Sequence, residues 1–253
     1  MKSWSVSDAE LSPGMRRALV AATMLLCLAW FFRDCLATGL HILYGDSYDG
    51  VIEVAILNHW YQVFVEGAAW DVMGYFHPYP ATLGYNDTYV LPGIPFTIAR
   101  IFGADPFLAA FASHVAMKAL GFAGMYVLLR RGIGISLALA LAGAALFATA
   151  NVSLLHMYHA QLLSVGLLPW LGFLALRAVA ALREDRPRAL VGHGCGFALL
   201  YGATALGRDL APRVGVVLGS KNEVERVTAE GGRGDVRNAP TIAPPGRRGN
   251  CKN

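Results

Sequence analysis

The sequence predicts an all-α integral membrane protein, and three observations support this prediction. Residues 132–150 form an uncharged, apolar run of nineteen residues, close to the ~20 residues with which a helix crosses the hydrocarbon of a bilayer. Several other stretches of the chain have a similar character. Hydrophobic residues make up 55% of the chain and charged residues only 15%, with a mean hydropathy of +0.45, which lies outside the usual range of soluble domains.

The apolar runs divide the chain into its expected elements. We expect about five transmembrane helices within a membrane domain over residues 16–206, at 16–33, 106–129, 132–150, 160–182 and 189–206. Arg16 and Arg17 precede the first run and place residues 1–15 in the cytoplasm, because basic residues favour that side. No small-residue cleavage site follows this run, so we interpret it as a retained helix.

Residues 34–87 are expected to form a loop on the outer side of the membrane. They contain seven acidic residues and neither lysine nor arginine, the opposite of a cytoplasmic loop. Within them, Asp49 to Val65 predicts an amphipathic helix that lies on the outer leaflet. Trp60 and Tyr61 suit its position at a membrane–water boundary.

The segment 88–103 is apolar but contains Pro92, Pro95 and Arg100. If this segment crossed the membrane, the next span would end on the outer side and would place Arg130 and Arg131 there. Arginines near the ends of spans are usually found on the cytoplasmic side. We therefore expect a re-entrant or interfacial segment here.

The last part of the chain, residues 207–253, differs in composition from everything before it. It contains nine of the 21 basic residues, many glycines and prolines, and no apolar periodicity. Such a composition buries too little surface to order itself. Two interpretations stay open: a disordered tail, or the product of a frameshift that truncates a longer membrane protein.

The acidic motif Gly45-Asp46-Ser47-Tyr48-Asp49-Gly50, with Glu53 after it, is the strongest candidate for chemistry. On a helix Asp46, Asp49 and Glu53 share one face. Carboxylates this close can supply a general base or hold a divalent cation. The alternative interpretation is a solvated helix start with an aspartate as N-cap.

Further polar residues are candidates for substrate binding. His114 and Lys118 are ionisable residues inside an apolar run, which in membrane proteins usually face a cavity or a functional site. Lys118 is suited to neutralise a lipid phosphate. The other candidates lie in the outward-facing segments, and they are His59, Asn86, Asp87, His156, His159 and Gln161.

The order of these motifs resembles the GT-C superfamily of integral-membrane glycosyltransferases. The matching features are an amino-terminal span, the acidic motif with Glu53, His59-Trp60, Trp70, Phe76-His77-Pro78-Tyr79-Pro80, Thr82-Leu83-Gly84-Tyr85-Asn86-Asp87, Phe102-Gly103 and Asp105-Pro106. The resemblance covers about residues 16–206, and each motif is short.

The resemblance implies transfer of a sugar from a polyprenyl-phosphate donor to an acceptor on the outer membrane face. It assigns the role of base toward the acceptor hydroxyl to Asp49, with Asp46 or Glu53 as alternates. It also implies a multi-pass protein of the bacterial inner (plasma) membrane, whose partners are membrane lipids and the donor. No cofactor is specified, although a divalent cation would fit the carboxylates.

Two other functional classes stay open. A transporter or flippase-like protein would use Lys118 and the outer carboxylates as a substrate path, but it would often show a repeat, and none is evident. The second of these classes is a non-catalytic membrane fragment. The net charge of +4 does not indicate nucleic-acid binding, since the basic residues cluster at the ends of apolar runs.

Overall fold

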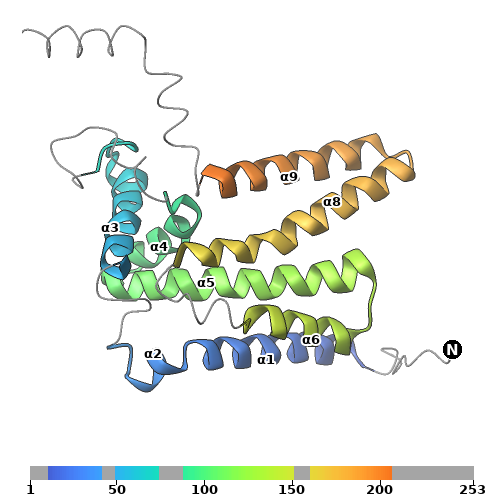
Figure 1. Cartoon of the computed structure of the whole chain (residues 1–253), viewed down its shortest axis with the longest axis horizontal. Coiled ribbons are helices and arrows are strands. Elements are labelled where there is room, and N and C mark those ends of the chain that lie inside the picture. The colour runs from blue at the N-terminus through green and yellow to red at the C-terminus, as the bar shows by residue number, and fades with distance from the viewer. Residues whose placement is uncertain (1–10, 42–48, 74–87, 151–159, 207–253) are drawn as a thin grey trace, which may run out of the picture. The chain divides into compact units, whose positions relative to one another are not determined.

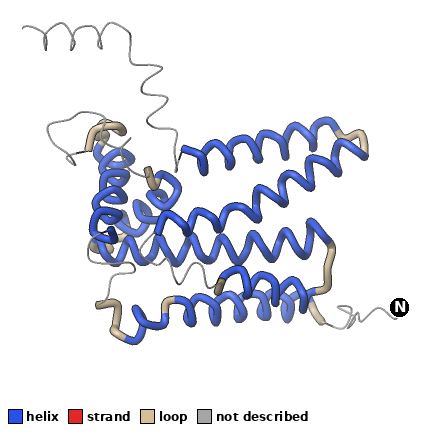
Figure 2. Tube along the Cα trace, in the orientation of Figure 1, coloured by secondary structure: helices blue, strands red, loops and turns tan. Residues whose placement is uncertain are grey.

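The computed structural model describes residues 11–41, 49–73, 88–150 and 160–206. This part of the chain contains helices and no strand (Figure 2). The α-helices are α1 (Pro13–Phe31), α2 (Arg33–Ala37), α3 (Asp49–Tyr61), α4 (Val90–Ile101), α5 (Pro106–Val127), α6 (Leu137–Ala148), α8 (Leu168–Arg183) and α9 (Pro187–Leu206). Two π-helical turns, η2 (Gln62–Glu66) and η4 (Leu128–Ile133), extend α3 and α5, and a 3₁₀ segment, η5 (Ala160–Leu167), precedes α8. The predicted all-α class is confirmed for these residues.

Local sequence signals explain where several helices begin. The side chains of Ser12, Asp105 and Ser136 accept hydrogen bonds from backbone N–H groups of α1, α5 and α6 respectively. These contacts satisfy donors that the first turn of a helix otherwise leaves unpaired. Proline occupies the first position of α1 and α5, where its missing N–H has no cost.

Three helices are long and apolar enough to cross a membrane. They comprise Pro13–Phe31 with 19 residues, Pro106–Ile133 with 28 and Leu163–Arg183 with 21. They correspond to the runs predicted at 16–33, 106–129 and 160–182. The run at 189–206 forms α9, which ends at the border of the described residues.

The longest apolar run of the sequence does not form a single helix. Gly132 and Ile133 belong to the end of η4, Gly134 has a left-handed φ of 84°, and Ser136 caps α6. α6 has only 12 residues and is therefore about 18 Å long, shorter than the hydrocarbon core. The run is split because a glycine with positive φ ends one helix and a serine begins the next.

The segment predicted as re-entrant or interfacial forms α4, a helix of 12 residues with Pro95 inside it. It packs against α3 and α5. The buried hydroxyl of Ser113 on α5 donates a hydrogen bond of 2.7 Å to the carbonyl oxygen of Pro92. α4 is thus fixed to the side of α5 and is too short to span a bilayer.

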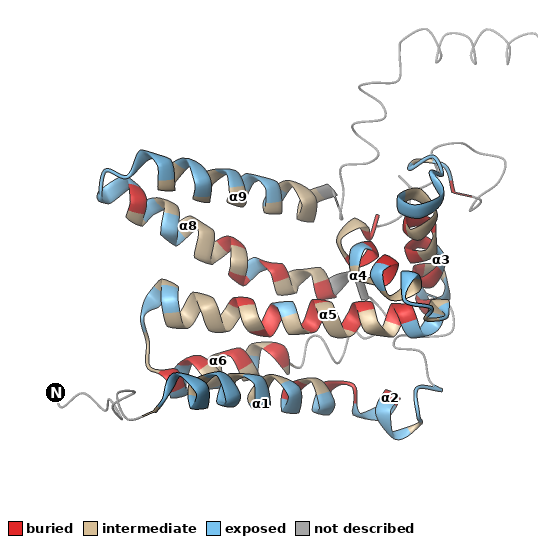
Figure 3. Cartoon of the chain, turned by 180° about the vertical axis from the view of Figure 1, so that it is seen from behind, coloured by how far each residue is buried: buried red, intermediate tan, exposed pale blue. Residues whose placement is uncertain are grey.

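α5 is the central helix of this assembly. It contacts α1, α3, α4, α6, η5 and α8. Figure 1 shows α1 and α6 along one side of α5, α8 and α9 along the other, and α3 with α4 at its amino end. Buried residues follow α5 and the inner faces of α3 and α6, whereas α1 and α9 expose much of their surface (Figure 3).

Two apolar clusters position the candidate site. The first joins α3, α4 and the start of α5, and it includes Leu57, Trp60, Phe96 and Ala110. The second joins α1, α2, η5 and the middle of α5, and it includes Phe31, Phe32, Cys35, Met117 and Leu163. The stretch of α5 between Ala110 and Met117 therefore lies between the two clusters.

Candidate functional site

A buried contact between Glu53 and His114 forms the centre of the candidate site. Glu53 lies on α3 and His114 on α5, and their relative exposures are 3% and 2%. His114 Nε2 and Glu53 Oε1 are 2.6 Å apart. This is the short distance of a charge-assisted hydrogen bond, in which the imidazole donates and the carboxylate accepts.

The burial of Glu53 excludes one interpretation of the sequence. As part of a solvated helix start, Glu53 would lie on the wet face of its helix. Instead the face of α3 that holds Glu53, Val54 and Leu57 packs into the protein. Burial of a carboxylate costs free energy unless a hydrogen bond or an ion pair compensates it. His114 provides this contact.

Lys118 lies one helical turn beyond His114 on α5 and is 7% exposed. Its Nζ lies 3.8 Å from the centroid of the Phe31 ring, which is a cation–π geometry. Within the part of the chain that the structure describes, no carboxylate lies within ion-pair distance of Lys118. α5 thus presents two basic side chains to the interior on successive turns, and one of them is paired with Glu53.

Asp49 is the first residue of α3 and is exposed. It lies one turn before Glu53, so the two carboxylates occupy neighbouring positions on the same helix. Asp49 is in the first turn, where the helix dipole favours a negative charge. The site therefore combines an accessible carboxylate with a buried pair and a buried cation.

His59 has a structural partner in this arrangement. It is 4% exposed, and its Nε2 lies 2.9 Å from the carbonyl oxygen of Trp70, to which it donates. The neighbouring Trp60 donates from Nε1 to the carbonyl oxygen of Thr88. These two bonds attach the chain segments on either side of 74–87 to α3. The prediction that His59 binds substrate stays open, but its Nε2 is occupied.

The remaining candidates from the sequence lie outside the described residues. They are Asp46, Asn86, Asp87, His156 and His159, together with the side chain of Gln161. The tail at 207–253 lies outside them as well. Among the residues that are described, no group of three or more histidine, cysteine, aspartate or glutamate side chains is arranged to hold a metal ion.

The pairing of Glu53 with His114 was not predictable from the sequence. The two residues are 61 positions apart and lie in segments that the sequence assigns to different environments, an outer-leaflet helix and a membrane span. The available signal was that each is an ionisable residue among apolar neighbours. Ionisable residues within apolar segments usually pair with one another.

Comparison with known proteins adds no assignment. No protein-family model matches this chain, and no curated protein or solved structure shows significant similarity to it.

Proposed function

We propose that this protein transfers a sugar from a polyprenyl-phosphate donor to an acceptor at the outer face of a bacterial plasma membrane. The observation that supports the proposal most is the buried Glu53–His114 contact of 2.6 Å. It attaches α3, which begins with Asp49, to α5, which contains Lys118. One helix supplies a base and the other a cation, and such a transfer needs both.

Asp49 serves the acceptor side of the reaction. It is exposed at the start of α3, where a hydroxyl group can reach it. During transfer the bond between the sugar C1 and the donor phosphate oxygen breaks, and a bond between C1 and the acceptor oxygen forms. Asp49 accepts the hydroxyl proton, and the polyprenyl phosphate leaves with the bonding electrons. General bases in such positions contribute about 10²–10⁴ in rate.

Lys118 serves the donor side. A polyprenyl-phosphate sugar contains a phosphodiester with a single negative charge, and a largely buried cation is suited to neutralise it. Glu53 contacts His114 rather than Lys118, which leaves the ammonium group of Lys118 for the ligand. The ring of Phe31 contacts the ammonium group by a cation–π interaction. Because the ring is uncharged, it does not compete with an anionic ligand for Lys118.

The proposal includes five helices within the membrane. α6 and α9 would join the three long helices because both expose large apolar side chains: Leu139 and Leu146 on α6, and Val191 and Leu199 on α9, are all more than 60% exposed. Side chains of this kind are suited to lipid rather than water. α6 would enter the membrane without crossing all of it.

The experiment measures release of free polyprenyl phosphate, a product common to every sugar. The full chain is reconstituted in liposomes and supplied with a panel of undecaprenyl- and decaprenyl-phosphate sugars, together with a bacterial membrane extract that supplies hydroxyl acceptors, and the lipids are analysed by mass spectrometry. Asp49→Asn should lower the rate by about 10²–10⁴. Lys118→Gln should raise the KM for the donor, with Lys118→Arg closer to the wild type.

Asp34→Asn is the matched control, because Asp34 is an exposed carboxylate that lies 3.7 Å from the guanidinium group of the surface residue Arg33. It should leave the rate unchanged. If the wild-type protein releases no polyprenyl phosphate from any donor in the panel, the proposal is wrong. If donor lipid moves between leaflets without loss of its sugar, the transporter or flippase alternative replaces it.

A further inference from the structure

One side of α4 holds two polar residues that the proposed transfer does not use. Gly93, Thr97 and Arg100 follow one another at intervals of four and three residues, so they lie on the same side of the helix. An added Cβ at Gly93 would lie 2.9 Å from Cβ of Trp60. The guanidinium carbon of Arg100 lies 5.1 Å from the centroid of the Tyr61 ring. This side of α4 therefore faces α3, and Thr97 lies on it between the two contacts.

Arg100 is held by two contacts that leave one edge of its guanidinium group unused. Its Nη1 donates a hydrogen bond of 2.8 Å to the carbonyl oxygen of Ala104, and the group lies over the Tyr61 ring in a cation–π geometry. Its Nε is buried and has no hydrogen-bond partner among the described residues. Nε and Nη2 together form one edge of the guanidinium group, and such an edge binds an oxyanion through two parallel hydrogen bonds. This edge is available for a ligand.

The charge of Arg100 has no counter-ion in the part of the chain that the structure describes, where no carboxylate lies within ion-pair distance of it. The carboxylate of Asp105, five residues on, accepts hydrogen bonds from the first turn of α5. Arg33 provides a comparison, because it also lies over an aromatic ring, that of Trp30 at 5.0 Å, and also donates to a backbone carbonyl. At Arg33, however, the carboxylate of Asp34 is 3.7 Å away.

Thr97 supplies a second polar group without a partner. It is 5% exposed, and its hydroxyl oxygen has no hydrogen-bond partner within residues 11–41, 49–73, 88–150 and 160–206. A buried hydroxyl in this state destabilises the fold unless a ligand or water satisfies it. Side chains three residues apart on a helix have Cβ atoms about 5–6 Å apart. A small oxyanion can therefore contact both Thr97 and Arg100.

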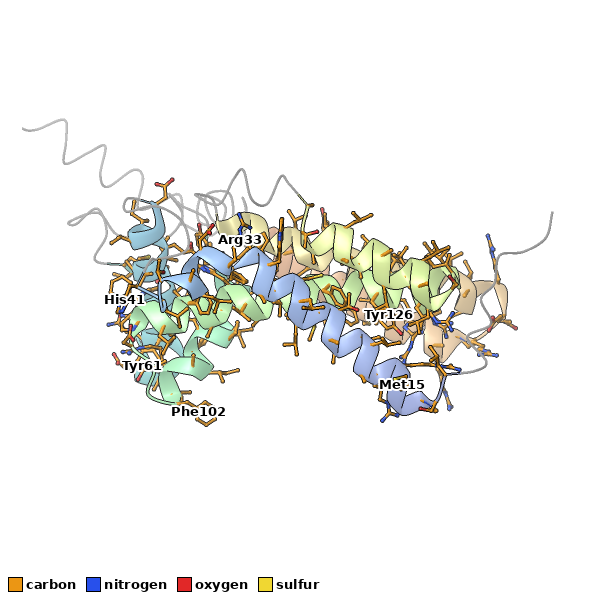
Figure 4. All side chains as sticks on the ribbon, turned by 90° about the horizontal axis from the view of Figure 1, so that it is seen from below. Met15, Arg33, His41, Tyr61, Phe102 and Tyr126 are labelled. Atoms are coloured by element: carbon orange, nitrogen blue, oxygen red, sulfur yellow. The ribbon has the colours of Figure 1, made fainter. Side chains whose placement is uncertain are left out.

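The two residues lie toward the end of α4 rather than deep in the assembly. Arg100 is half-buried, and the two residues that follow it, Ile101 and Phe102, are 62% and 86% exposed. Tyr61 and Phe102 lie at the same end of the helical assembly, opposite Met15 (Figure 4). A ligand can thus approach the guanidinium group from the end of the helix.

We infer that Arg100 and Thr97 form a binding site for a phosphate group at the end of α4. Two phosphate oxygens would accept hydrogen bonds from Nε and Nη2 of Arg100, and a third would accept one from the hydroxyl of Thr97. A carboxylate has only two oxygens, and the guanidinium edge uses both, so the additional hydroxyl favours phosphate. The phosphate belongs either to a lipid headgroup or to a free ion, since the same donors recognise both. This inference does not depend on the proposed sugar transfer.

The test measures phosphate binding to the delipidated full chain in detergent. Inorganic phosphate is titrated by isothermal titration calorimetry, and palmitoyl-oleoyl-phosphatidylglycerol is titrated by native mass spectrometry. At least one of them should bind, and Arg100→Gln should weaken that binding at least about tenfold. Arg100→Lys should recover only part of the affinity, because lysine keeps the charge but lacks the edge with two donors.

Thr97→Val separates binding from folding, because valine has nearly the shape of threonine and lacks the hydroxyl. This variant should weaken phosphate binding by about two- to tenfold. Its Tm should equal or exceed that of the wild type, since the hydroxyl has no partner within the described chain. A lower Tm with unchanged binding would show that the hydroxyl serves the fold, and it would overturn the inference.

Arg33→Gln is the matched control, because Arg33 has the same kind of ring and carbonyl contacts but already has Asp34 beside it. It should bind as the wild type does. Binding of phosphatidylglycerol without binding of inorganic phosphate would identify a lipid headgroup, whereas binding of inorganic phosphate would show that the free ion is sufficient. Three results would overturn the inference: neither probe binds, Arg100→Gln binds as the wild type does, or acetate competes as strongly as phosphate.

Discussion

The Glu53–His114 pair allows a quantitative prediction about stability. Its side chains are 4% and 2% exposed and its atoms are 2.6 Å apart, so replacing one partner leaves the other buried without its counterpart. Removal of one partner of such a pair typically costs about 3–5 kcal/mol. For a chain of this size, 1 kcal/mol corresponds to about 2–4 °C in Tm, so Glu53→Leu and His114→Leu should each lower Tm by about 6–20 °C.

The double variant separates the pair from the packing around it. Glu53→Leu with His114→Leu replaces both polar groups by apolar ones of similar volume, and it should recover much of the Tm lost in either single variant. The assay is thermal unfolding in detergent, followed by helical circular dichroism. The exposed pair Arg33–Asp34, at 3.7 Å, provides the control, since Asp34→Ala should change Tm by at most about 4 °C.

Two results would refute this reasoning. One is that both single variants melt within about 2 °C of the wild type. The Glu53–His114 contact would then contribute no more to the free energy of unfolding than a surface contact does. The other is a double variant whose loss equals the sum of the two single losses. That result would show that the two side chains act on stability independently of each other.

Two further predictions concern helix packing and a thiol. An added Cβ at Gly124 would lie 2.6 Å from the indole ring of Trp170, so Gly124→Ala should displace the ring, lower Tm by about 2–12 °C and shift the tryptophan fluorescence. Burial, with the nearby negative charge of Asp34, raises the pKa of the Cys35 thiol, so less reactive thiolate is present at neutral pH. Maleimide should therefore label Cys35 faster at higher pH and faster in Asp34→Asn than in the wild type at pH 7; a labelling rate, measured by mass spectrometry, that changes with neither would contradict this.

The sequence predicted those parts of the fold that depend on local patterns. The three long helices follow from apolar length, and the shortness of α4 agrees with its prolines and with the placement of Arg130 and Arg131. The division of the run 132–150 also has a local cause in Gly134 and Ser136. Hydropathy alone does not predict this division, because both residues lie in an uncharged, apolar run. The outer-loop helix was expected at Asp49, where α3 begins.

The parts that escaped prediction depend on contacts between distant segments. α3 was expected on the membrane surface, yet it packs against α4 and α5, because its apolar positions and Glu53 meet partners that only the fold supplies. Likewise, Lys118 was identified as a candidate, but its position over the Phe31 ring requires α1 and α5 to be neighbours. Periodicity indicates that a face is apolar and does not identify the element that covers it.

The length of α5 has a consequence for the way this protein depends on its lipid environment. With η4 the helix contains 28 residues, about 40 Å of rise, whereas the hydrocarbon core is about 30 Å thick. A helix longer than the hydrocarbon core tilts in the bilayer or locally thickens it. Since α5 is the helix that α1, α3, α4, α6 and α8 contact, a change in tilt would alter the depth of His114 and Lys118 below the surface. Bilayers of different acyl-chain length should therefore change the water access of these two residues without any change in sequence.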